Sequence, residues 1–236
     1  MTRYPATIAV SAAVAIGFVL QWFLPLEALF ERNPAAIAAG QWWRVLTSVF
    51  VQGSGWGQFL FNTLGMVVVG AAVEQTRGTL QWLVAALAAQ VGASLCAIWW
   101  APTANDSGSS LVVGGLVGLL SFTHFVRPVG WAAGSAAYRV FYVSYLAGLA
   151  LAGPLGAAVV GSLSAGVVTS LLLRSRWATW CLSVVLIVVV VASWVLVAAR
   201  DQHGVAVLQG LAVALVAGPP WGRPRPSAGQ LGDPAD

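Results

Sequence analysis

The chain has 236 residues, of which 59% are hydrophobic and 8% are charged, and it carries a formal net charge of +4. A soluble domain needs roughly a quarter of its residues charged, so this composition excludes that class and indicates an integral membrane protein. Arginine is the only source of positive side-chain charge besides histidine, and no basic stripe interleaved with aromatic residues marks a nucleic-acid interface. We therefore expect the lipid bilayer and other membrane proteins as partners, and no nucleic acid.

Apolar runs follow one another along the whole chain, and most are long enough to cross the hydrocarbon layer as helices. In chain order they cover residues 6–24, 57–73, 79–100, 111–126, 131–153, 155–173, 177–199 and 204–218. The fourth and the last run are short. The predicted fold class is all-α: a polytopic membrane helical bundle of about eight transmembrane helices.

The arginines are distributed unevenly between the loops on the two sides of this bundle. With the N-terminus inside, only Arg32, Arg44 and Arg200 of the 11 basic residues fall outside. Basic residues favour cytoplasmic loops, so the bias supports an even number of crossings with both termini in the cytoplasm. We expect the protein in a bacterial plasma membrane.

Domain organisation is simple. Residues 1–218 are predicted to form one transmembrane domain, with a long first loop over residues 25–56 that carries three tryptophans and few charges. Tryptophan prefers the membrane interface, so this loop is expected to lie there. Residues 219–236 are rich in Pro and Gly and are predicted to form a disordered cytoplasmic tail.

Ser110 and His203 each lie where a loop leads into an apolar run, and the number of crossings between them places both on the same side of the membrane. A serine hydroxyl is a weak nucleophile until a neighbouring base takes its proton. The only other histidine, His124, lies 14 residues after Ser110 in one run, roughly 21 Å away along a helix. Ser110 and His203 are therefore the candidate catalytic pair.

Several short motifs occur in a fixed order along the chain. They are Trp43-Arg44 in the first loop, Gln58-Phe59-Leu60-Phe61-Asn62 at the start of the second run, Glu74 with Gly78 at its end, Gly108-Ser109-Ser110-Leu111 before the fourth, and His203 with Ala206 and Gly210 in the last. In this order they resemble the motifs of the rhomboid intramembrane serine proteases. The resemblance implies a rhomboid-like bundle in which Ser110 is the nucleophile and His203 is the base, a pair without the third member of a triad.

The same resemblance implies the activity: hydrolysis of a peptide bond in or near a transmembrane segment of another protein, without a metal or cofactor. Gln58 and Asn62 stand four residues apart, so on a helix they share one face. Their amide groups are candidate oxyanion-binding donors. The alternative for these two side chains is hydrogen bonding between helices, which is common for polar residues in membranes.

A second function stays open: a proteolytically inactive rhomboid relative that binds transmembrane client proteins. It is favoured by Leu111 in place of the motif's second glycine, by Gln58 in place of a histidine, and by Gly114 in place of an aromatic residue that packs beneath the catalytic histidine. In that case Ser110 would cap its helix, and His203 would be an ordinary loop residue beside Arg200 and Asp201. A transporter is disfavoured by the lack of conspicuous mid-membrane charges.

Overall fold

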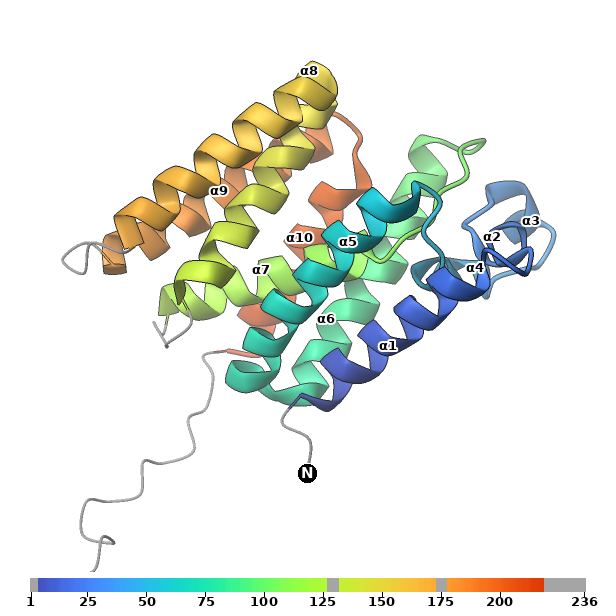
Figure 1. Ribbon diagram of the computed structural model, residues 1–236, viewed down its shortest axis with the longest axis horizontal. Helices are drawn as coiled ribbons and strands as arrows, with labels where there is room; N and C mark the ends of the chain where they lie inside the picture. Colours follow the sequence, from blue (N-terminus) through green and yellow to red (C-terminus); the bar gives the residue numbers. More distant parts are fainter. Residues whose placement is uncertain (1–3, 127–131, 173–177, 219–236) are drawn as a thin grey trace, which may run out of the picture.

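The computed structural model of the protein describes residues 4–126, 132–172 and 178–218, and over these residues the chain folds as a helical bundle (Figure 1). The α-helices are α1 (Pro5–Leu20), α2 (Leu26–Phe30), α3 (Pro34–Ala38), α4 (Arg44–Thr47), α5 (Gly55–Gly65), α6 (Ala71–Trp100), α7 (Ser110–Val126), α8 (Ala132–Leu172), α9 (Ala178–Ala198) and α10 (Gln202–Val216). A 3₁₀ turn at Ser48–Phe50 and a π-helical turn at Met66–Gly70 complete these segments. The predicted all-α class is confirmed, whereas the predicted tail, residues 219–236, lies outside the described residues.

Two of the long helices reverse direction at a glycine. Gly78 in α6 has a φ of 81°, and Gly153 in α8 has a φ of 71° and is followed by Pro154. A Cβ on Gly148 would lie 2.9 Å from the Cα of Ala157, an approach that a straight helix does not permit between residues so far apart. The two halves of α8 are therefore antiparallel, and they lie side by side in Figure 1. In α6 the reversal at Gly78 lies near the start of the helix, so the span before it consists of α5, the π-helical turn and the first residues of α6. The boundaries predicted near Gly78 and Gly153 are confirmed.

Among the described residues, three helical stretches are long and apolar enough to cross a membrane: Gly55–Trp100, Gly134–Leu172 and Trp180–Ala198. The first two contain the reversals at Gly78 and Gly153, and α1, α7 and α10 are shorter apolar helices. Large hydrophobic side chains are exposed on the outside of the bundle, among them Leu80, Leu155 and Ile187. An apolar outer surface of this kind is expected for an integral membrane protein.

Helix α7 lies at the centre of the bundle and contacts α6, α9 and α10. Leu116, Leu119 and Leu120 have no exposed surface. Figure 1 shows α8 and α9 on one flank of this centre, and α1 with the short helices of the first loop on the opposite flank.

Glycines bring α7 and α10 into backbone contact. A Cβ on Gly210 would lie 1.9 Å from the carbonyl oxygen of Gly115, and a Cβ on Gly118 would lie 2.0 Å from that of Val207. Small residues allow such an approach between membrane helices. Gly115 and Gly118 thus serve the packing of the two helices, whereas Gly166 in α8 has open space where its Cβ would be.

The first loop is held together by Arg44. Its guanidinium donates to the carbonyl oxygens of Glu31 at 3.1 Å and Ala28 at 2.9 Å, and to the side-chain oxygen of Gln41 at 2.7 Å. The side chain is buried, and its burial is tolerated because its N–H donors find acceptors inside the loop. Arg44 therefore has a structural role.

At the opposite end of the bundle, Glu74 serves the start of α1. Its carboxylate accepts the backbone N–H groups of Ala6 and Thr7, each at 2.9 Å, and the hydroxyl of Thr79 at 2.8 Å. The first N–H groups of a helix have no acceptor within the helix, and the Glu74 carboxylate is the acceptor for those of Ala6 and Thr7. Arg77 donates to Thr123 at 2.8 Å and has a structural role as well.

We predict that Gly210→Ala lowers the thermal unfolding midpoint of the detergent-solubilised protein, because the new methyl group would overlap the Gly115 carbonyl and force α7 and α10 apart. Overpacking of this kind typically costs about 1–3 kcal/mol. The matched control is Gly166→Ala in α8, whose Cβ would meet no atom within 4 Å. Equal midpoints for the two variants would contradict the proposed close contact.

Candidate functional site

Ser110 and His203 are brought together by the fold. Ser110 is the first residue of α7, and His203 lies in the first turn of α10. The Nε2 atom of His203 is 2.9 Å from the Oγ of Ser110. Both residues are half-buried, so the pair lies at the end of the bundle and not in its centre.

The close packing of α7 and α10 sets this distance. Both helices begin at the same end of the bundle, and Ala206 and Gly210 of α10 face Gly114 and Gly115 of α7 one and two turns further on. The backbone contact there holds the first turns of the two helices close together, within reach of a hydrogen bond between Ser110 and His203.

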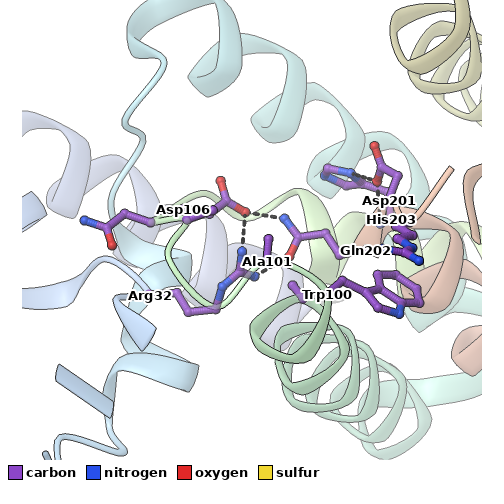
Figure 2. Close-up of a pocket in the computed structure, with 11 residues that line it drawn as sticks. Arg32, Trp100, Ala101, Asp106, Asp201, Gln202 and His203 are labelled. Atoms are coloured by element: carbon purple, nitrogen blue, oxygen red, sulfur yellow. Dashed lines mark hydrogen bonds and ion pairs between the residues drawn. The ribbon is translucent and has the colours of Figure 1, made fainter. Parts of the chain in front are cut away.

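Asp201 lies on the other side of the His203 ring. It is the N-cap of α10, and its Oδ1 accepts the backbone N–H of His203 at 2.8 Å. The same oxygen lies 2.6 Å from Nδ1 of the ring, a contact drawn in Figure 2. Burial raises the pKa of the Asp201 carboxyl, but the attraction of His203 and these hydrogen bonds outweigh burial and hold the pKa below its ordinary value.

Sequence reasoning missed this contact. It treated Asp201 only as a neighbour of His203 in a loop. The available signal was an aspartate two residues before the histidine, at the position where a helix begins. An aspartate there is usually explained by capping alone, so the signal is weak.

A polar bridge joins three separate segments beside this site. Arg32 of the first loop pairs with Asp106, at 3.2 Å between Nη2 and Oδ2, and the backbones of the two residues exchange hydrogen bonds at 2.7 and 3.0 Å. Gln202 at the start of α10 bonds to both side chains. Figure 2 shows the three residues linked in this way. The bridge fixes the loop before α7 to the start of α10.

A cavity of about 250 Å³ adjoins His203. Its polar lining comes from the bridge and from the start of α10, and includes Arg32, Asp106, Arg200, Asp201 and Gln202. Such a lining can hold water, because several groups there offer hydrogen bonds.

The predicted oxyanion donors lie beside the loop that precedes Ser110. Gln58 donates through Nε2 to the carbonyl oxygen of Ser107 at 2.7 Å, and Asn62 donates through Nδ2 to Oε1 of Gln52 at 3.0 Å. Both amides therefore form hydrogen bonds within the protein. Their role as oxyanion donors stays a prediction.

Gly108 occupies a backbone conformation that favours glycine, with a φ of 129°. Its N–H donates to the carbonyl oxygen of Ser48 at 2.9 Å, and a Cβ here would overlap the end of the Gln58 side chain. The glycine of the predicted motif thus lets the chain turn into α7 beneath Gln58.

Tyr142 of α8 fills the space above Gly114. Its hydroxyl donates to the carbonyl oxygen of Ser110 at 2.7 Å, and its ring lies edge-on to the His203 ring, with centroids 6.5 Å apart. A Cβ on Gly114 would lie 3.0 Å from that hydroxyl. Gly114 stands where an aromatic residue was expected to pack against His203, and Tyr142 of α8 supplies this aromatic ring instead. No local signal in the sequence identified Tyr142.

The second histidine takes no part in this site. His124 is buried near the far end of α7, where its Nδ1 lies 3.1 Å from a guanidinium nitrogen of Arg139. The prediction that it lies out of reach of Ser110 is confirmed.

Fold and site together define a polytopic helical membrane protein with a serine–histidine pair at the shared end of two adjacent buried helices. The Rhomboid domain family model matches residues 39–176, and the chain belongs to the rhomboid family. The family predicted from the motifs is thereby confirmed. The matched range contains Gln58, Asn62 and Ser110 and ends before His203.

Among curated proteins, the chain is similar to the Rhomboid protease GluP of Bacillus subtilis (strain 168), with 32% identity over 110 residues. The aligned part covers 44% of this chain and 22% of that protein. The chain thus spans about a fifth of the length of this curated relative. No solved structure matches the chain.

Proposed function

We propose that the protein is an intramembrane serine protease that hydrolyses a peptide bond in or near a transmembrane segment of another protein. The observation that carries the proposal is the 2.9 Å contact between Ser110 Oγ and His203 Nε2. A nucleophile and its base must approach to about 2.6–3.2 Å, and this pair does so. The family assignment and the similarity to a rhomboid protease support the same activity.

In the proposed mechanism, Ser110 Oγ attacks the scissile carbonyl carbon while His203 Nε2 takes the hydroxyl proton. His203 then gives this proton to the leaving amine, and an acyl-enzyme remains on Ser110. A water molecule, activated by the same nitrogen, releases the acyl group and restores the serine. The cavity beside His203, which is lined in part by polar groups, offers a place for this water.

Gln58 and Asn62 are proposed to stabilise the oxyanion during the attack. Each side-chain amide carries two N–H donors, and the contacts with the Ser107 carbonyl and the Gln52 side chain use one donor of each. The oxyanion role therefore requires only that the second N–H of each amide reach the oxyanion, and does not require these contacts to break.

The second candidate is a proteolytically inactive relative that binds transmembrane clients. It is favoured by one observation in particular: the Gln58 amide holds the loop before Ser110 and the Asn62 amide bonds to Gln52, which are structural functions. The first candidate is preferred because the inactive relative has no need of a bonded serine–histidine pair.

The proposed site faces the outside of a bacterial plasma membrane, with both termini in the cytoplasm. The proposal is supported by the arginine bias of the loops and by the position of Ser110 and His203 at the end of the bundle that carries the first loop, with Arg32 and Arg44.

For topology, we expect a green fluorescent protein fused to either terminus to fluoresce, and alkaline phosphatase fused to either terminus to stay inactive, because the first folds in the cytoplasm and the second outside it. A phosphatase fusion within the first loop should be active. An active C-terminal phosphatase would contradict this topology.

A fluorophosphonate probe should label the wild-type protein in detergent, and Ser110→Ala and His203→Ala should each abolish labelling and cleavage of a transmembrane reporter substrate. Since residues that act as one unit are strongly non-additive, the double variant should be as inactive as either single one. Ser164→Ala, on α8, is the control and should keep both activities. Cleavage that survives His203→Ala, or labelling of another serine, would favour the client-binding relative.

Gln58→Ala should lower the cleavage rate by about 10²–10³, the typical effect of removing one oxyanion donor. Gln58→His should retain most of the activity, because histidine also presents an N–H donor. The thermal midpoint is measured in parallel to separate this effect from loosening of the loop at Ser107. An unchanged rate in Gln58→Ala would exclude the oxyanion role.

A further inference from the structure

The His203 ring is bonded through both of its nitrogens. Nε2 lies 2.9 Å from Ser110 Oγ, and Nδ1 lies 2.6 Å from Asp201 Oδ1. A carboxylate can only accept a hydrogen bond, so the contact with Asp201 requires the proton on Nδ1. The lone pair of Nε2 is then directed at the serine hydroxyl, which is the form that a general base needs.

Asp201 is itself held firmly. Its Oδ1 accepts the backbone N–H of His203 at 2.8 Å, and 27% of the side chain's surface is exposed. Hydrogen bonds to a partly desolvated carboxylate are shorter and stronger than those between neutral groups. The next residue, Gln202, is fixed by its bonds to Arg32 and Asp106.

Other charged and titratable groups surround the ring without touching Nδ1. Asp106 and Arg32 face it from the bridge and oppose each other in charge, Arg200 lines the adjoining cavity, and Tyr142 presents its ring edge from α8. Asp201 is thus the carboxylate, among the described residues, that is placed to fix the ring and to stabilise the imidazolium formed when His203 takes the serine proton.

We propose that Asp201 is a positioning residue of the active site, so that Ser110, His203 and Asp201 act as a triad. The proposal rests on the proteolytic function proposed above. During attack the serine proton moves to Nε2, the Nδ1 proton stays on the ring, and Asp201 remains ionised throughout. Capping of α10 and orientation of the ring use the same oxygen, so one side chain performs both tasks.

The test compares Asp201→Asn with Asp201→Ser, since both residues are good N-caps and preserve the start of α10. The asparagine oxygen can keep both hydrogen bonds and removes only the charge. The serine hydroxyl caps the helix but is too short to reach Nδ1. Thermal midpoints should therefore match the wild type in both variants, while kcat/KM towards a transmembrane reporter substrate should fall.

In Asp201→Ser we expect kcat/KM to fall by roughly 10²–10⁴, because the ring loses both its orientation and its charge partner. In Asp201→Asn the fall should be smaller, and the acid limb of the pH–rate profile should move to lower pH, since a nearby negative charge favours the protonated ring. Asp106 is a carboxylate that faces the ring without touching it, so Asp106→Asn should move this limb less. Unchanged kcat/KM and an unchanged pH profile in both Asp201 variants would overturn the proposal and show that Asp201 acts only as a helix cap.

A second readout does not depend on proteolysis. Nitrogen-15 labelling of histidine gives NMR signals from only two residues, His124 and His203. The wild type should show a hydrogen-bonded Nδ1–H on His203, absent in Asp201→Ser and retained in Asp106→Asn. If the wild type shows this signal but cleaves nothing, the proposed function fails and the positioning contact stands. If the wild type cleaves but its Nδ1–H signal is unaffected by Asp201→Ser, the triad is wrong and the protease is not.

Discussion

The backbone contact between α7 and α10 is the constraint on which the rest of the site depends. At Gly115, Gly118 and Gly210 no side chain separates the two helices, so at these positions the backbone of each helix contacts that of the other. Lipid and helix surfaces are equally apolar, and close packing is what holds helices together in a membrane. The short distance between Ser110 and His203 follows from this contact, because the two residues stand at the starts of the two packed helices.

Hydrogen bonds and an ion pair then fix the starts of α7 and α10, which the glycine contacts bring together. Gln58 holds the loop before α7, while Arg32, Asp106 and Gln202 join that loop to the start of α10. Hydrogen bonds of this kind are strong where water is scarce, and a buried polar group without a partner is costly. The serine–histidine pair thus lies between the close-packed apolar part of α7 and α10 on one side and hydrogen-bonded polar loops on the other.

Much of this arrangement follows from the sequence because its causes are local. Apolar runs separated by loops predict the spans, and Gly78 and Gly153 mark reversals that only a residue tolerant of positive φ accepts easily. Ser110 and His203 were found because a motif and the number of crossings agree. Tyr142 could not be found, since its contact depends on how α8 packs against α7, and Asp201 was concealed by its ordinary role as a cap. The direction of the Gln58 amide was also out of reach, because it depends on the path of the chain around Ser107.

The carboxylate of Glu74 has a consequence for the order in which the protein is made. The free N–H groups at the start of α1 find their acceptor 67 and 68 residues later in the chain. Until Glu74, at the end of the second span, has been synthesised, these N–H groups have only water as a partner. The start of α1 therefore reaches its final position only once the second span is in place, and not when α1 itself is made.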